Sequence, residues 1–239
     1  MMKTIAVIGA SGAIGNAFTC ALAGRDKDSR IYAFSRSGKV FAQANVISGK
    51  IDMADEASIE AAARQASEQA PLDMVIVATG ILHQDTIMPE KSLKDIAADN
   101  FVRVFHANTL GPALVMKHFL PNLRRQHRGI FAVLSARVGS ISDNRLGGWY
   151  AYRASKAALN MLIKNASIEM ARFHKKMIII GLHPGTVDSK LSQPFQTHVP
   201  PERLFTPASS VEKMLAVIDT LTPADSGKCV AYDGNEIFP

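Results

Sequence analysis

The sequence predicts a single α/β domain over residues 1–239, built on a doubly wound parallel sheet of about seven strands. Short runs rich in β-branched residues alternate with longer helical patterns, which is typical of repeated β-α-β units. Hydrophobic residues make up 47% of the chain, which is enough material for a large core. No repeat, low-complexity tract or linker divides the sequence.

The expected strands are short runs dominated by Ile, Val or Phe, because a central parallel strand is buried on both faces. They are Thr4–Ile8, Arg30–Phe34, Val46–Ile51, Met74–Ala78, Ile130–Leu134, Met177–Leu182 and Cys229–Tyr232. The expected helices are the Ala-rich or amphipathic stretches between them. They are Ile14–Ala23, Glu56–Ala70, Leu93–Leu123, Ala151–Phe173 and Ser209–Leu221. The Pro-rich stretch Gln193–Pro207 follows a strand, where such folds place substrate loops.

Positive charge is in excess but scattered, with a formal net charge of +6. The densest cluster, Arg124, Arg125, His127 and Arg128, lies near the end of an expected helix, so we interpret it as a solvated helix terminus. No nucleic-acid-binding motif accompanies it. Neither nucleic acid nor a membrane is therefore expected as a partner.

Two cysteines, Cys20 and Cys229, form no CxxC motif, and both are expected to be buried, reduced thiols. No metal site is expected. The apolar run Ile5–Ile8 leads straight into glycines and does not resemble a signal peptide. No apolar stretch approaches the roughly 18 residues that a membrane span needs. A cytoplasmic location is the resulting expectation.

A glycine-rich turn follows the first strand, with the sequence Gly9-Ala10-Ser11-Gly12-Ala13-Ile14-Gly15. Glycines close a tight strand-to-helix turn and let backbone N–H groups approach a phosphate at the helix N-terminus. The position directly after the first strand favours a dinucleotide-binding Rossmann fold. Many strand–helix corners also need glycine, so a purely structural interpretation of this turn stays open.

The end of the second strand indicates which dinucleotide is bound. NAD-binding proteins usually place Asp or Glu there to hold the ribose 2′-hydroxyl. Here the run is Ser35-Arg36-Ser37, in which Arg36 offers a guanidinium to a 2′-phosphate and the two serines offer hydroxyl donors. This predicts NADP, with a solvated loop arginine as the alternative. Asp52 is expected either to accept from an adenine amino group or to cap the following helix.

Tyr152 and Lys156 are four residues apart at the start of an expected helix and therefore share one face. A tyrosine has an ordinary pKa near ~10, and a fixed nearby cation lowers that pKa by stabilising the phenolate. The pair follows a strand at the carboxyl side of the sheet, where ligands bind in open α/β folds. It is a candidate acid/base centre, although surface pairs often share this spacing.

Taken together and in order, these motifs resemble the short-chain dehydrogenases/reductases over essentially the whole chain. The matching segments are Gly9–Gly15, Asp52, Ala78-Thr79-Gly80, Asn108, Leu134–Gly139, Tyr152 with Lys156, and Pro184–Ser189. Three further segments resemble the C-factor-like group, which is similar to sniffer-type carbonyl reductases. They are Asp143–Trp149, Tyr150–Lys156 and Asp233–Pro239.

The resemblance implies hydride transfer between NADP(H) and a small carbonyl or alcohol substrate. Tyr152 would be the acid/base, Lys156 would hold the nicotinamide ribose, and Asn108 would kink its helix and bind a relay water. The helices that carry Asn108 and Tyr152 typically form an interface, which implies a homodimer or homotetramer. The residues expected to bind NADP are Gly9, Ser11, Gly12, Ala13, Ile14, Gly15, Ser35, Arg36, Ser37, Asp52, Met53, Ala78, Thr79, Gly80, Asn108, Tyr152, Lys156, Pro184, Gly185, Val187 and Ser189.

The sequence departs from the family pattern at the catalytic serine, which normally stands three residues before a glycine. Counting back from Gly139 lands on Ala136. Ser135 is the candidate replacement, but adjacent strand residues point to opposite faces unless a bulge intervenes. Ser140 and Ser142 are further candidates. A smaller departure is Ile8, which stands where the family has threonine.

Two functions remain in competition at this point. The first is an NADPH-dependent carbonyl reductase, which requires Tyr152, Lys156, Asn108 and Arg36. The second is an NADP-binding signalling or regulatory protein with weak or no turnover, which the C-factor resemblance and Ala136 motivate. A purely structural Rossmann domain leaves the tyrosine, lysine and asparagine unexplained.

Overall fold

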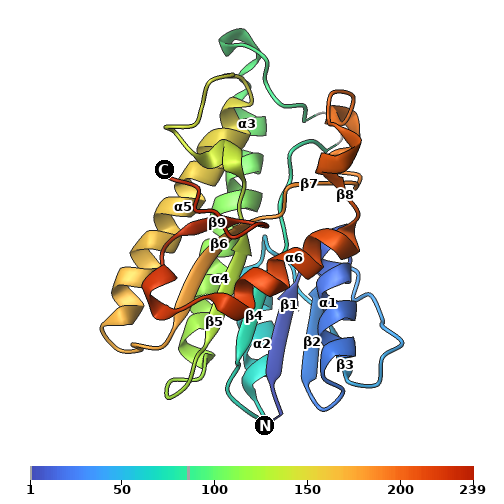
Figure 1. Ribbon diagram of the computed structural model, residues 1–239, viewed down its shortest axis with the longest axis vertical. Helices are drawn as coiled ribbons and strands as arrows, with labels where there is room; N and C mark the ends of the chain where they lie inside the picture. Colours follow the sequence, from blue (N-terminus) through green and yellow to red (C-terminus); the bar gives the residue numbers. More distant parts are fainter. Residues whose placement is uncertain (1, 85–86) are drawn as a thin grey trace.

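A computed structural model describes residues 2–84 and 87–239 and shows the expected parallel sheet. The strand order is β3-β2-β1-β4-β5-β6-β9, and every pairing is parallel (Figure 1). The strands are β1 (Thr4–Ile8), β2 (Arg30–Ser35), β3 (Val46–Lys50), β4 (Met74–Val77), β5 (Ile130–Leu134), β6 (Ile178–His183) and β9 (Cys229–Ala231). The predicted α/β fold class is thereby confirmed.

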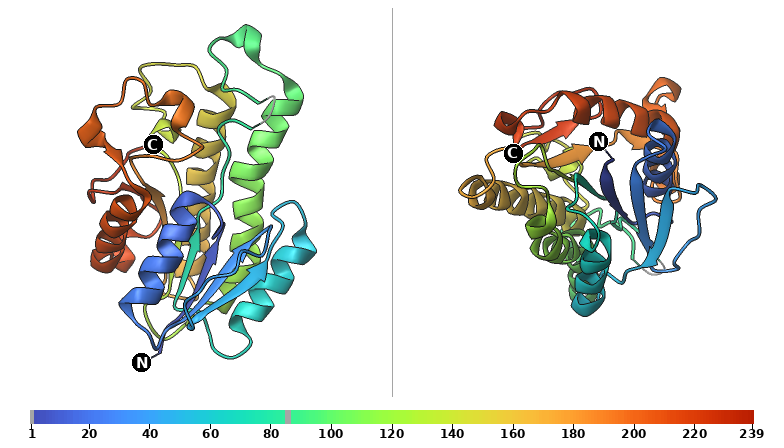
Figure 2. Two further views of the ribbon diagram at one scale, coloured as in Figure 1. Left: turned by 90° about the vertical axis from the view of Figure 1, so that its right-hand side faces the viewer. Right: turned by 90° about the horizontal axis from the view of Figure 1, so that it is seen from below.

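Helices cover both faces of the sheet (Figure 2). Helices α1 (Ala13–Arg25) and α6 (Pro207–Thr220) pack together on one face. The opposite face is covered by α2 (Glu56–Ser67), α4 (Gly111–Phe119) and α5 (Tyr150–Ala171). The sheet therefore lies between two apolar layers, which is why its inner strands β1 and β5 are buried at every residue.

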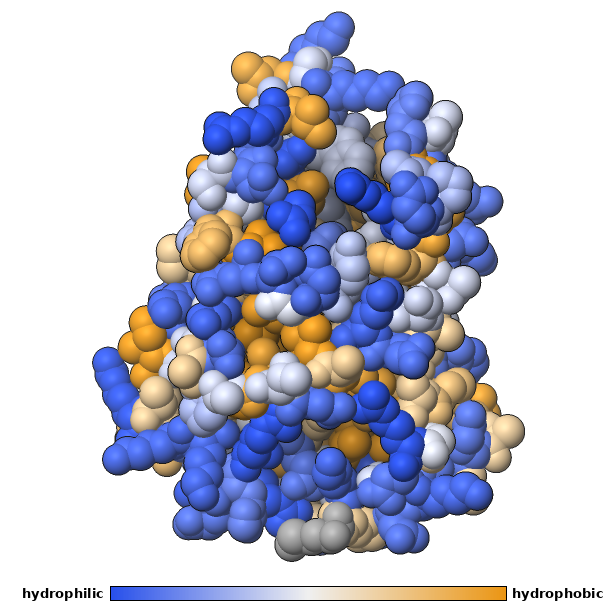
Figure 3. Space-filling view, in the orientation of Figure 1, coloured by the Kyte–Doolittle hydropathy of each residue, from blue (hydrophilic) through white to orange (hydrophobic). Residues whose placement is uncertain are grey.

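Each layer has its own hydrophobic core. Phe18 of α1 and Met214 of α6 belong to one, and Phe34 of β2 and Phe119 of α4 belong to the other. Fully burying one such side chain contributes roughly 1.5–3 kcal/mol to folding. On the outside, the face in Figure 3 shows mostly hydrophilic side chains with hydrophobic ones interspersed.

The strand order reverses direction around β1, because β2 lies on one side of it and β4 on the other. In open α/β sheets this switch point opens a crevice at the carboxyl ends of the strands. The irregular segments gather at that end, around α3 (Ala98–Phe105) and the two-stranded sheet of β7 (Thr186–Val187) and β8 (Leu204–Phe205) (Figure 1). The fold therefore directs any ligand to this end.

The single helix expected over Leu93–Leu123 is wrong, because the structure breaks it into several pieces. After α3 comes a π-helical turn, His106–Leu110, and then α4. Pro112 lies at the start of α4 and has no N–H to donate to the carbonyl four residues earlier. That carbonyl belongs to Asn108, so the series of helical backbone hydrogen bonds is interrupted at this candidate catalytic residue.

Short 3-10 turns complete the chain, including two inside the Pro-rich loop. They are η1 (Leu93–Asp95), η3 (Leu120–Asn122), η4 (Arg137–Gly139), η5 (Gln193–Phe195), η6 (Pro201–Arg203) and η7 (Pro223–Asp225). Among the residues described, no helix combines the length and apolar character that a membrane crossing requires.

Two further expectations need correction. Cys229 is buried as expected, but Cys20 is exposed, because it lies on the outer face of α1. The basic cluster is not simply solvated. Arg124 forms a half-buried ion pair with Asp73 (Nε–Oδ1 2.7 Å), and Arg128 donates to the carbonyls of Ile218 and Leu221 at the end of α6. These two arginines therefore join elements that are distant in sequence.

Candidate active site

The glycine-rich turn has a conformation that requires glycine at two positions. Gly9 has φ +88°, and a Cβ there would lie 2.7 Å from the carbonyl oxygen of Ala78. A Cβ on Gly15 would overlap the carbonyl oxygen of Gly9, so Gly15 lets α1 pack against the turn. The backbone of β1 can thus approach the end of β4 closely, and this brings the two sides of the crevice together.

The N-terminus of α1 is suited to an anion. Its N-cap is Gly12, which has no side chain to accept from the first N–H groups, and the first turn contains no acidic residue. Uncapped N–H groups and the helix dipole together favour a phosphate at this position.

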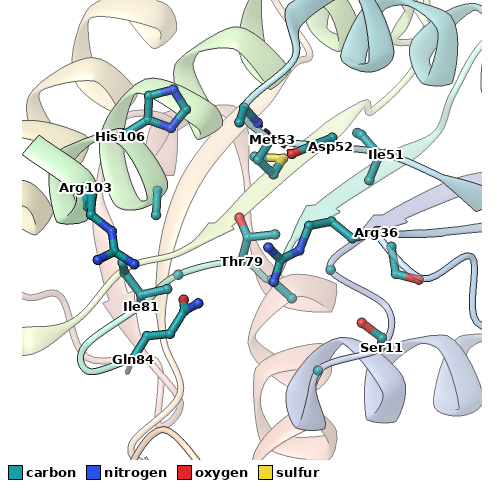
Figure 4. A pocket seen from close by; sticks show the side chains of 17 residues that line it. Ser11, Arg36, Ile51, Asp52, Met53, Thr79, Ile81, Gln84, Arg103 and His106 are labelled. Atoms are coloured by element: carbon teal, nitrogen blue, oxygen red, sulfur yellow. Dashed lines mark hydrogen bonds between the residues drawn. The ribbon is translucent and has the colours of Figure 1, made fainter. Parts of the chain in front are cut away.

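A cavity of about 460 Å³ opens beside this helix start. Figure 4 shows Arg36, from the end of β2, and Arg103, from α3, projecting into it from opposite sides. The cavity is lined by the predicted residues Gly9, Ser11, Gly12, Ser35, Arg36, Asp52, Met53, Ala78, Thr79 and Gly80. Ala13 and Gly15 belong to the turn but not to the cavity lining.

The loop after β2 is ordered by its own hydrogen bonds. Ser35 Oγ accepts from the backbone N–H of Lys39 (3.1 Å), while Lys39 Nζ donates to Asn16 Oδ1 of α1 (2.6 Å). Ser35 and Arg36 line the cavity, whereas Ser37 lies outside its lining and only approaches Ser35 (Oγ–Oγ 3.4 Å). The second bond holds this loop against α1, near the N-terminus of that helix.

Asp52 lies in the cavity lining and accepts from the N–H of Ala54 (3.0 Å). The cap of α2 is instead Asp55, whose Oδ1 accepts from the N–H of Ala57 (3.0 Å). The helix cap, one of the two roles expected for Asp52, is therefore held by Asp55.

Sequence reasoning missed several residues of this cavity. They are Ile51, Ala54, Ile81, Gln84, Arg103, His106 and Ala107. Arg103, His106 and Ala107 have helical spacing, which is the only signal for them in the sequence. This spacing did not identify them in advance, because the helix break after α3 determines which face of α3 lines the cavity.

A second cavity, of about 290 Å³, adjoins the first: Ile81 lines one cavity and Leu82 the other. It contains Tyr152, with Ile14 from the glycine-rich turn and Trp149 from the start of α5. The predicted residues Pro184, Gly185, Val187 and Ser189 line it as well. Phe195 and Val199 of the Pro-rich loop also line it.

Gly185 lines the second cavity at a position that requires glycine. It has φ +74°, and a Cβ there would lie 2.7 Å from the ring of Phe205. His183, the last residue of β6, also lines this cavity. Burial lowers the pKa of His183 to about 4, and the nearby Arg137 acts in the same direction. The imidazole is therefore neutral at physiological pH.

Tyr152 and Lys156 lie close together, as their spacing predicts. Lys156 Nζ is 5.9 Å from the centroid of the Tyr152 ring and donates to the carbonyl oxygen of Leu134 (2.9 Å). Burial raises the pKa of Tyr152 to about 12 and lowers that of Lys156 to about 8. Burial thus acts on Tyr152 against the cation effect expected from the sequence, and its phenol is protonated at neutral pH.

Asn108 is fully buried in the π-helical turn and bridges three elements. Its Oδ1 accepts from the N–H of Ile81 (2.8 Å), and its Nδ2 donates to the carbonyl of Ile81 (2.9 Å) and to Ser155 Oγ of α5 (3.1 Å). Gly80 lies directly against this group, since a Cβ there would be 3.1 Å from Asn108 Oδ1 and 3.6 Å from Lys156 Nζ. Asn108 therefore ties the cavity wall to the helix that carries Tyr152.

The position at which the family has its catalytic serine is occupied by Ala136, as the count back from Gly139 indicates. Ala136 lines the cavity that contains Tyr152. Ser135 lines it too, but its hydroxyl donates to Asn160 Oδ1 (2.6 Å). Ser140 is buried and contacts Ser142 (Oγ–Oγ 3.3 Å), and both lie in a separate pocket near the C-terminus.

Comparison with known proteins gives the family. The sequence profile described as short chain dehydrogenase matches residues 3–200. The chain belongs to the short chain dehydrogenase family. This short chain dehydrogenase is an oxidoreductase, and the resemblance found in its motifs is confirmed.

Individual relatives agree with the narrower resemblance. The C-signal protein of Myxococcus xanthus is 37% identical over 146 residues, which span 61% of this short chain dehydrogenase and 82% of the relative. A carbonyl reductase from chicken fatty liver, solved with NADPH bound, is 25% identical with a TM-score of 0.84, covering 100% of this chain and 99% of that one. The carbonyl reductase Sniffer of D. melanogaster, 20% identical with a TM-score of 0.84 and 100% coverage of both chains, has the same fold.

Proposed function

We propose that this short chain dehydrogenase is an NADP(H)-dependent reductase of small carbonyl compounds. The observation that carries the proposal is the position of Tyr152. Tyr152 lines a cavity of about 290 Å³, with Lys156 Nζ 5.9 Å from its ring, and this cavity adjoins a larger one beside the start of α1, whose first N–H groups have no side-chain cap. A carbonyl substrate in the smaller cavity and a dinucleotide in the larger one would therefore lie next to each other, beside the phenol of Tyr152.

The residues of the larger cavity fit NADP. Thr79 Oγ1 is buried there and lacks a hydrogen-bond partner within the described part of the chain, so it is available to a ligand. Arg36, beside Ser35, can bind the 2′-phosphate, and no acidic residue at the end of β2 opposes it. The NADPH bound by the chicken relative supports the same cofactor.

The chemistry of the site suits carbonyl reduction. When bound, the reduced nicotinamide supplies a hydride to the carbonyl carbon. Tyr152 then donates its proton to the carbonyl oxygen, because a pKa of about 12 keeps the phenol protonated at neutral pH. Lys156, with a pKa of about 8, is largely cationic there and stabilises the phenolate that remains. We leave Ser135 out of this path, because its hydroxyl is engaged by Asn160.

A second candidate is an NADP-binding signalling protein with little turnover. Two observations favour it: Ala136 replaces the serine hydroxyl in the cavity, and the C-signal protein of Myxococcus xanthus is 37% identical over its matched region. The loss of one hydrogen-bond donor to developing charge costs about 2.7–4 kcal/mol at a transition state. Such a loss slows an enzyme without preventing cofactor binding.

Incubation with NADPH and a panel of activated ketones distinguishes the two. The reductase predicts loss of NADPH absorbance together with an equal amount of alcohol product. Tight NADPH binding without alcohol from any ketone supports the signalling protein instead.

We also propose a homo-oligomer, in which α4 and α5 pair with a second copy of the chain. Leu110, Met161 and Ile168, on or next to these helices, are exposed hydrophobic residues. Sedimentation of the wild type at the mass of a dimer or tetramer supports this assembly, and sedimentation as a monomer contradicts it.

A further inference from the structure

Glu90 is a buried carboxylate that the proposed reaction does not use. It lies in the segment between β4 and η1, only 5% exposed, and lines neither of the two large cavities. A charged side chain is rarely buried to this extent unless its oxygens accept hydrogen bonds. Its partners therefore indicate what it does.

Those partners lie at the first turn of α5, some sixty positions later in the chain. Glu90 Oε2 accepts from the N–H of Ala151 (3.2 Å), and the Glu90 carbonyl accepts from the N–H of Trp149 (2.5 Å). Gly148 packs on the same carbonyl, since a Cβ there would lie 3.3 Å from it. One residue thus holds both sides of the turn that starts the helix.

Helix α5 needs such a partner because its own N-cap has no suitable side chain. The N-cap residue is Trp149, which has no oxygen to accept from the second N–H of the helix, that of Ala151. The first turn also has no acidic residue. The buried carboxylate of Glu90 supplies both the missing acceptor and the negative charge that favours a helix N-terminus.

The backbone of Trp149 is strained. Its φ of +51° makes it the one non-glycine residue with positive φ in the part of the chain that the structure describes. Bulky residues occupy this region only where their surroundings hold them. Glu90 accepts from the N–H of Trp149 itself and from the N–H of Ala151 two residues later, so both bonds restrain the backbone at this position.

The strained conformation directs the indole into the substrate cavity. The Trp149 ring packs edge-on against Tyr152 (centroids 6.1 Å apart, planes at 78°) and against Phe195 of the Pro-rich loop (5.0 Å, 62°). The indole therefore forms the wall between the proton donor and the loop.

We propose that Glu90 is a positioning residue: by capping α5 in place of a local side chain, it fixes Trp149 as the aromatic wall of the cavity that holds Tyr152. Its effect on substrate affinity rests on the proposed reductase function, whereas its effect on Trp149 does not.

Two substitutions that keep a side chain of similar size distinguish the effect of losing the cap acceptor from the effects of losing the charge or the volume. Glu90→Gln removes the charge but keeps an oxygen acceptor, and Glu90→Met removes both. Trp149 is the only tryptophan of the chain, so intrinsic fluorescence reports on this side chain alone. Glu60→Met, at an exposed position of α2, serves as the matched control.

We expect Glu90→Gln and Glu60→Met to keep the emission maximum and the KM of the wild type. Glu90→Met is expected to shift the emission to longer wavelength, to increase acrylamide quenching, and to raise the KM for an aryl ketone about fivefold, the factor equivalent to the roughly 1 kcal/mol that an N-cap oxygen contributes. Unchanged emission in Glu90→Met overturns the proposal, as does an equal shift in Glu90→Gln. If the wild type reduces no ketone, the fluorescence and quenching still decide the role of Glu90.

Amide hydrogen exchange in the wild type tests the proposal without relying on the folding of any variant. The N–H of Ala151 should exchange slowly, because Glu90 accepts from it. The N–H of Asp99 holds the same position in α3, whose N-cap Ala97 forms no side-chain cap, and should exchange fast. Equally fast exchange at both positions overturns the proposal.

Discussion

Lys156 Nζ lies 5.9 Å from the centroid of the Tyr152 ring and donates to the carbonyl of Leu134 at the end of β5 (2.9 Å). The strand end thus fixes the ammonium beside the phenol. The same burial moves the two pKa values in opposite directions, to about 8 for Lys156 and about 12 for Tyr152. At neutral pH the pair therefore combines a protonated phenol with a cation.

Carbonyl reduction is expected to slow as the pH rises through about 8. Above this value Lys156 loses the proton that stabilises the Tyr152 phenolate, while Tyr152 itself stays protonated to about 12. The measurement is kcat against pH at saturating NADPH. A rate that stays level well above pH 8 contradicts the assignment of Lys156.

Arg36→Ala is expected to weaken NADPH binding about tenfold or more, because a hydrogen bond to a charged group contributes about 1.5–3 kcal/mol. Binding of NADH should hardly change, since it lacks the 2′-phosphate. Fluorescence titration of both cofactors measures this, and NADH serves as the internal control. Equal affinity of the wild type for NADPH and NADH is the result that rules out the role of Arg36.

Ala136→Ser is expected to raise kcat by about 10²-fold, because it adds a hydroxyl donor to the cavity that contains Tyr152. Ser135→Ala is the matched control and should leave kcat near the wild-type value, since Ser135 already donates to Asn160. Steady-state kinetics on one ketone compares the three proteins. A large loss of kcat in Ser135→Ala would show that Ser135 is the catalytic hydroxyl after all.

Acidification should destabilise the fold through His183. Its pKa is lowered from 6.5 to about 4 by burial, so the unfolded chain binds more protons between these values and stability falls as the pH drops through this range. The contribution is about 2 kcal/mol between about pH 7 and about pH 5.

Chemical denaturation at both pH values measures this contribution. His183→Gln should lose less unfolding free energy on acidification than the wild type. His198→Gln, at an exposed loop position, should behave like the wild type. Identical pH dependence in all three proteins would contradict the burial effect.

The strands could be predicted because each is determined locally. Thr4–Ile8 and Ile130–Leu134 are uninterrupted apolar runs, and burial on both faces is what such runs require. The glycine-rich turn could also be predicted from the sequence, since the conformation of Gly9 excludes other residues. Most of the residues that line the larger cavity were predicted from these elements and from the family resemblance.

What the sequence did not predict depends on contacts between distant residues. Only the family resemblance implied a kink at Asn108, and the helical pattern did not show it, because the break involves hydrogen bonds with Ile81. Arg128 likewise donates to the carbonyls at the end of α6. The cap of α5 comes from Glu90 rather than from a neighbouring residue. Such partners come together only in the folded chain, so no local pattern indicates them.

The central claim is that Tyr152 donates the proton in an NADPH-dependent carbonyl reduction. Its most direct test is the kcat of Tyr152→Phe against the wild type on a ketone that the wild type reduces, with NADPH affinity measured in both. We predict that kcat falls about 10²–10⁴-fold, the contribution of a positioned acid, while NADPH still binds. Turnover equal to that of the wild type in Tyr152→Phe would contradict the account.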